Sequence, residues 1–250
     1  MNSRLIFLPT VFIALIALVL WWQFRTADFG YIMASVGVAN LGAAWWIVRQ
    51  RRDWWSFAII PAFILWSGFS YALVVTNQYL ALASVLISAL LSILYWRLVF
   101  LYIFNQLAYR PFSLERLFGY VSFATVFFSI SSAYALKTFL DWPTWQPAVV
   151  VLIVIMGLSY QWQWINKIEW KLAWPYVAFF PIAITELFFV IAFLPLDFNV
   201  SGFLIGSSWY ALSQLSSANI SGKLNPQRIR LAGLGLILIW VSLLLTARWF

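Results

Sequence analysis

Long stretches without a charged residue dominate this sequence and limit what it can fold into. Only 9% of the 250 residues are charged and 64% are apolar, whereas about a quarter of the residues in soluble domains are charged. A helix needs about 20 apolar residues to cross a bilayer. The composition therefore excludes a soluble fold and predicts an integral membrane protein that consists almost wholly of membrane spans.

Nine apolar runs, separated by polar or charged segments, have the length of a membrane-spanning helix. The runs cover residues 5–24, 29–48, 54–75, 80–104, 117–136, 147–165, 172–194, 200–218 and 231–247. Each run is continuously apolar, whereas the strands of membrane barrels alternate polar and apolar residues over about 10 positions. We therefore expect an all-α, polytopic membrane protein of about nine helices that forms a single membrane domain over residues 1–250.

Basic residues are distributed unevenly between the two ends of these runs. Twelve of the 15 fall on one side, namely Arg4, Arg49, Arg51, Arg52, Arg97, Arg110, Arg116, Lys167, Lys171, Lys223, Arg228 and Arg230. Loops rich in Lys and Arg stay in the cytoplasm. The pattern predicts a cytoplasmic N-terminus and an outer C-terminus, most simply in the plasma membrane. The net charge of +8 then indicates attraction to anionic lipid and not to nucleic acid.

Tryptophans support these boundaries, because indole rings prefer the depth of the lipid headgroups. Most of the 17 tryptophans lie at predicted span ends. The sixth run ends in the alternating sequence Gln161, Trp162, Gln163 and Trp164. We interpret this end as an interfacial anchor.

Two similar stretches predict an internal duplication. Pro61 follows an Asp-Trp pair and Pro181 follows a Glu-Trp-containing loop, and the spacing from Asn105 to Gly119 equals that in the segment 219–233. Tandem four-helix units would then follow a first anchor helix at 1–28, with repeat A at 29–140 and repeat B at 141–250. Such units lie parallel, related by an axis along the membrane normal. The alternative is that general rules for inner loops produce both stretches.

Polar groups at membrane depth are few, and ionisable ones are costly there. Glu186 is the only carboxylate within a predicted span middle, roughly 12 Å from the outer end at 1.5 Å per residue. We expect a polar layer at this depth, formed by Glu186, Asn40, Ser88, Ser129, Ser207 and Ser208. One interpretation is a proton, cation or substrate site. The other is a protonated Glu186 that hydrogen-bonds to Ser or Asn and holds helices together.

Small residues and prolines predict where helices approach closely or bend. The packing positions are Ser84 and Ser92, which flank Ser88 at four-residue spacing, and the pair Gly202 and Gly206. Pro61 and Pro181 are expected to kink their helices. Arg97, seven residues from the inner end of its span, can extend its side chain to the headgroups.

The residue inventory narrows the function. The chain has no His and no Cys, so histidine-ligated metals and Ser-His or Cys nucleophiles are excluded, and we expect no catalytic, metal or cofactor site. The favoured hypothesis is a non-enzymatic scaffold or accessory subunit of a membrane complex, with lipids, other membrane proteins or its own copies as partners. The alternatives are a small permease, flippase or ion-coupled transporter around Glu186, and more distantly a membrane-embedded lipid-handling enzyme.

Overall fold

The computed structural model describes residues 38, 42, 45, 56–105 and 107–247. Its contacts divide the chain into two units, residues 1–121 and 122–250, and each unit is described by itself. The first predicted span, all of the second except residues 38, 42 and 45, and Asn40 lie outside the described residues. The prediction of nine spans therefore stays a prediction for its N-terminal part.

All regular structure in the described residues is helical. The helices are α3 (Ser56–Val74), α4 (Gln78–Phe104), α5 (Ser113–Phe139), α6 (Trp145–Ile165), α7 (Trp170–Ile191), α8 (Phe198–Ile220) and α9 (Pro226–Thr246). Six of them are long and apolar enough to cross a membrane, namely α3, α4, α5, α6, α7 and α9. The chain is therefore helical and has the character of a membrane protein. α8 is 23 residues long but carries several serines, which lower its hydropathy.

Side chains at the loops explain where several helices begin. Asn77 accepts hydrogen bonds from the backbone N–H groups of Tyr79 and Leu80 at the start of α4. Asn225 caps α9 in the same way, and Pro226 follows at a position where a helix does not need the missing N–H. These polar residues stop one apolar run and start the next, so the span boundaries follow from local chemistry.

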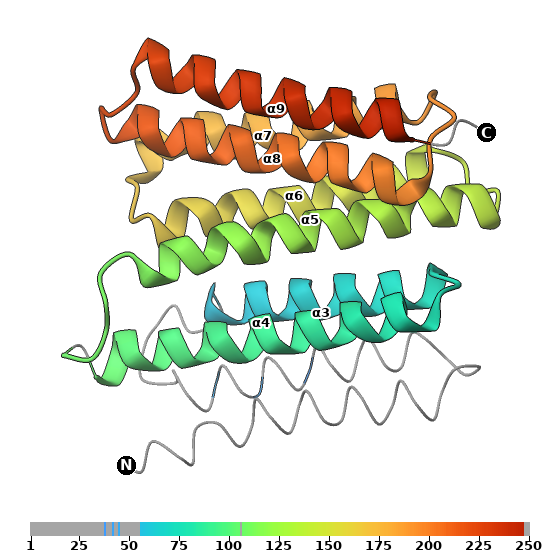
Figure 1. Cartoon of the computed structure of the whole chain (residues 1–250). Helices are drawn as coiled ribbons and strands as arrows, with labels where there is room; N and C mark the ends of the chain where they lie inside the picture. Colours follow the sequence, from blue (N-terminus) through green and yellow to red (C-terminus); the bar gives the residue numbers. More distant parts are fainter. Residues whose placement is uncertain (1–37, 39–41, 43–44, 46–55, 106, 248–250) are drawn as a thin grey trace. The chain divides into compact units, whose positions relative to one another are not determined.

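In the first unit, α3 and α4 form an antiparallel pair joined by the short turn at residues 75–77 (Figure 1). Gly68 lies at the closest approach, because a Cβ atom on it would overlap the hydroxyl group of Ser88 and lie 3.2 Å from the carbonyl oxygen of Ser84. The Ser84 hydroxyl group also donates to the carbonyl of Gly68 at 3.2 Å. Small residues on both helices therefore permit near backbone contact.

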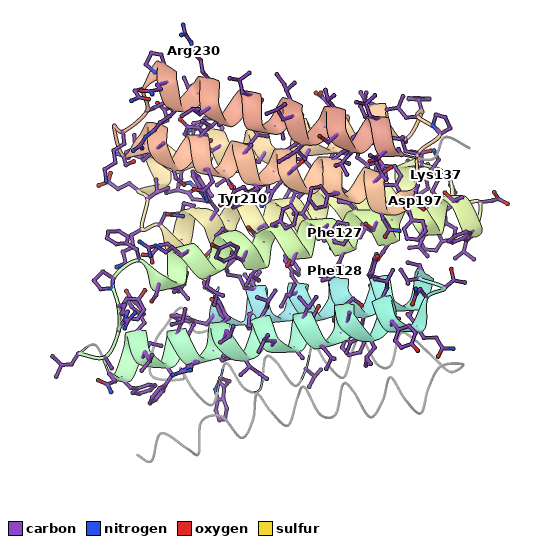
Figure 2. All side chains as sticks on the ribbon, in the orientation of Figure 1. Phe127, Phe128, Lys137, Asp197, Tyr210 and Arg230 are labelled. Carbon is purple, nitrogen blue, oxygen red and sulfur yellow. The ribbon has the colours of Figure 1, made fainter. Side chains whose placement is uncertain are left out.

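In the second unit, consecutive helices pack on one another from α6 to α9 (Figure 1). α5 joins this unit at Ser122 and packs on α8, where a Cβ atom on Gly202 would lie 2.9 Å from the carbonyl oxygen of Phe127. Figure 2 shows Lys137 and Asp197 at one end of this unit and Arg230 at the other. α9 is the least buried helix of this unit, because none of its side chains is buried.

The division of contacts differs from the predicted repeat boundary. Most of α5 clusters with the helices that follow it, whereas the duplication hypothesis assigns residues 29–140 to one repeat. The duplication stays a prediction, since much of repeat A lies outside the described residues. Pro61 and Pro181 both lie inside continuous helices, α3 and α7.

Candidate functional site

Glu186 lies on an outward face of α7. Its side chain is exposed, whereas its neighbours Ile184 and Phe188 are buried. The helix ends at Ile191, so the carboxylate is about 7.5 Å from the helix end at 1.5 Å per residue, nearer than the 12 Å expected. Within the described part of the chain no hydrogen bond to this carboxylate is present.

The hydroxyl groups of the expected polar layer bond mainly to their own helices. Ser207 and Ser208 both donate to the carbonyl of Leu204, at 2.9 and 2.8 Å. Ser88 donates to the carbonyl of Ser84 at 2.7 Å within α4. Ser129 is buried on α5. The described residues therefore include buried hydroxyl groups in both units, but Glu186 does not bond to any of them.

The predicted packing residues lie on buried faces. Ser84, Ser88 and Ser92 are buried on α4, and the first two lie against Gly68. In the second unit a Cβ atom on Gly202 would overlap the Ser131 hydroxyl group. One on Gly206 would lie 3.3 Å from the ring of Phe123. Ser84, Ser88, Gly202 and Gly206 therefore lie at close contacts between helices.

Two side chains of α5 bind the last turn of α7. The hydroxyl group of Tyr134 donates to the carbonyl of Phe188 at 2.6 Å, and its ring stacks on the Phe188 ring with centroids 4.4 Å apart. One turn further, the Lys137 ammonium group donates to the carbonyl of Ala192 at 2.8 Å. A cation at a helix C-terminus also interacts favourably with the helix dipole. This pair, which we term the α7 clamp (Tyr134 and Lys137), fixes α7 at the end near Glu186.

The other end of the second unit holds a cluster of aromatic rings between α6, α7 and α8. Phe180 packs edge-on against Trp162 and Trp209, with centroids 5.5 and 5.4 Å apart. The Trp162 indole donates to the Ser217 hydroxyl at 2.9 Å, and the Asn219 amide donates to the Tyr176 hydroxyl at 2.7 Å. Polar groups on α8 thus supply hydrogen-bond partners for Trp162 and Tyr176 in this cluster.

This cluster corrects the interpretation of the end of the sixth span. Trp162 is only 2% exposed and Gln161 is fully buried, so these two residues are not an interfacial anchor. Gln163 instead donates to the carbonyl of Ile168 in the following loop. The missed signal lay in α8, where Ser217 and Asn219 supply hydrogen-bond partners for aromatic groups on α6 and α7.

The chemistry available to these residues is chiefly structural. Among the described residues no group of three or more acidic side chains could hold a metal ion. Among the buried side-chain polar atoms of the second unit that have no hydrogen-bond partner in the described structure are the Trp209 indole N–H and the Ser131 hydroxyl. They lie on α8 and α5 respectively. The chain matches no protein-family model, no curated protein and no solved structure.

Proposed function

We propose that this chain is a non-enzymatic scaffold or accessory subunit of a membrane complex. The observation that supports this proposal is that buried serine hydroxyl groups form hydrogen bonds within their own helices. Those of Ser88, Ser207 and Ser208 each donate to a carbonyl of their own helix. A carrier of polar solutes needs several convergent polar ligands near the midplane. Hydroxyl groups that are occupied locally serve packing better than they serve solute binding.

The surface on which a partner would dock is available on α9. This helix buries none of its side chains, and it exposes a line of apolar residues three or four positions apart. They are Leu231, Leu234, Leu238, Val241 and Leu245. In a membrane such a line packs on another helix through van der Waals contact. A partner membrane protein, in contact with lipid around it, is therefore the binding partner we propose for α9.

The test is native extraction of the tagged protein with its surrounding bilayer, followed by mass spectrometry. We expect one other integral membrane protein in constant ratio to this chain. The double variant Leu234→Ala with Leu238→Ala should lower its recovery severalfold. The matched control is Leu82→Ala with Leu86→Ala, two exposed leucines on α4, which should not. Recovery of the same proteins with an unrelated multi-span bait would count against the proposal.

A small permease is the second candidate, and the buried groups without partners favour it. The Trp209 indole N–H and the Ser131 hydroxyl are groups that a polar solute could satisfy. Glu186 separates the two functions. In ion-coupled transport Glu186→Gln abolishes uptake and leaves stability unchanged or higher, because the cost of placing a charge within the membrane is removed. In a scaffold the same variant leaves folding and assembly nearly intact, since an amide keeps a donor and an acceptor.

A further inference from the structure

One face of α7 carries five exposed residues at the spacing of a helix-pairing seam. They are Pro175, Phe179, Ile182, Glu186 and Phe189, each three or four residues from the next. Phe179 and Ile182 are 55% and 56% exposed. Residues at this spacing form one line along a helix and can interdigitate with the same line on a neighbouring helix. We call these five residues the α7 seam.

Glu186 makes this seam different from the apolar line on α9. Ionisable side chains within spans almost always face a protein interior or a partner, because a carboxyl group in hydrocarbon lacks hydrogen bonds. The described part of the chain supplies no hydrogen bond to Glu186. A line made only of Leu and Val has no such requirement, since lipid tails are as apolar as its side chains. The α7 seam therefore needs a neighbour with a hydrogen-bonding group at the depth of Glu186.

We propose that the α7 seam pairs with the same seam of a second copy, with the two Glu186 carboxyl groups hydrogen-bonded to each other. Copies of one sequence insert with one orientation, so a two-fold axis along the membrane normal makes their α7 helices parallel. Each residue then meets its counterpart at its own depth. A protonated carboxyl group both donates and accepts, so each Glu186 satisfies the other. The proposal rests on the assembly function above and names the chain itself as one partner.

The apolar members of the seam fit this arrangement. Phe179 and Ile182 precede Glu186 along α7 and Phe189 follows it, so the carboxyl pair is enclosed by apolar side chains from both copies. The α7 clamp lies on a different face, because Tyr134 stacks on the ring of Phe188, which is buried and not part of the seam. Pairing therefore leaves the packing of α7 within its own unit unchanged.

Disulfide formation tests the geometry directly, because the chain contains no Cys. In membranes treated with copper phenanthroline, Ile182→Cys should give a covalent dimer, since the two residues face each other across the axis. Leu238→Cys on α9, which is 65% exposed, is the matched control and should stay monomeric. A monomer at position 182, or equal dimer yields at both positions, would overturn the proposal. Covalent capture of a different protein at position 182 would overturn it as well.

Charge reversal tests the role of the carboxyl pair. Glu186→Lys should abolish self-association, because two ammonium groups repel at the same depth. Mixing Glu186→Lys with the wild-type chain should restore dimers, since Lys then faces Glu. Glu186→Gln should dimerise like the wild type, and Glu186→Leu should raise the dissociation constant about three- to thirtyfold. Dimers that survive in Glu186→Lys alone, or no recovery on mixing, would refute the pairing.

The outcomes separate this proposal from the assembly function. Monomers with an intact α9-dependent partner would refute only the α7 seam. Dimers without any partner on α9 would refute only the scaffold role. The Ile182→Cys variant keeps Glu186, so the disulfide experiment still tests the proposal if a Glu186 variant fails to fold.

Discussion

Removal of the Tyr134 hydroxyl group measures how strongly α5 holds α7. The group donates to the carbonyl of Phe188 at 2.6 Å, and the ring of Tyr134 stacks on that of Phe188. Tyr134→Phe deletes the hydrogen bond and keeps the stack. Tyr134→Leu deletes both. The difference between the two variants therefore separates the contribution of the hydrogen bond from that of the aromatic contact.

The stability loss expected for Tyr134→Phe is small, because the carbonyl of Phe188 accepts a second hydrogen bond. The backbone N–H of Ala192 also donates to the carbonyl of Phe188, at 3.0 Å, so Tyr134→Phe leaves no unsatisfied acceptor. Hydrogen bonds between membrane helices average about 0.6 kcal/mol and reach about 1.7 kcal/mol. We expect Tyr134→Phe to lower the free energy of unfolding by about 0.5 to 1 kcal/mol.

Tyr134→Leu removes the aromatic stack on Phe188 in addition to the hydrogen bond. Such pairs contribute about 0.5 to 1.5 kcal/mol beyond the area they bury, so Tyr134→Leu should lower the free energy of unfolding by about 1 to 3 kcal/mol in total. The assay is unfolding in mixed micelles of mild detergent and increasing dodecyl sulfate. Tyr79→Phe, at an exposed tyrosine of α4, is the control and should be neutral. Equal losses for the Phe and Leu variants, or no loss for either, would refute this account of the clamp.

Three further predictions address topology, close packing and the cation at the end of α7. A single Cys at Thr144 should react with an impermeant thiol reagent in intact cells and one at Asn166 should not; the reverse pattern contradicts the orientation. Gly68→Ala should lower the free energy of unfolding by about 1 to 3 kcal/mol through overpacking, while Gly233→Ala, which meets no atom within 4 Å, should be neutral or stabilising in the same unfolding assay. Lys137→Met should lower it by about 0.3 to 1 kcal/mol and Lys137→Arg should not; equal losses would show that charge is not what matters there.

Apolar runs and capping residues made much of the fold predictable. Seven predicted runs correspond to the seven described helices, because a charge or a cap such as Asn77 or Asn225 ends each run. Contacts between residues far apart in the sequence could not be predicted in this way. Trp162 at a span end matches the interfacial pattern, yet its indole binds Ser217, which lies 55 residues further along the chain. Local sequence does not carry that pairing.

The direction in which Glu186 points could not be predicted either. Its depth follows from counting residues, but the face that it occupies depends on which side of α7 packs on α6 and α8. Besides Glu186, α7 carries only Lys171, Tyr176 and Thr185 as polar side chains, so its sequence alone gives little signal to choose the face that packs. The Tyr134 and Lys137 contacts with α7 were likewise invisible, because both act on backbone carbonyl groups that every residue possesses.

The absence of buried side chains on α9 predicts that the helices of the second unit differ in mechanical stability. A helix that buries no side chain and is held to its unit mainly by its packing on α8 belongs to the least stable region of the second unit. When the C-terminus is pulled from a bilayer by an atomic force microscope tip, α9 should leave first, at a lower force than the clamped α7. A single rupture that extracts α7, α8 and α9 together would show instead that these helices yield as one block.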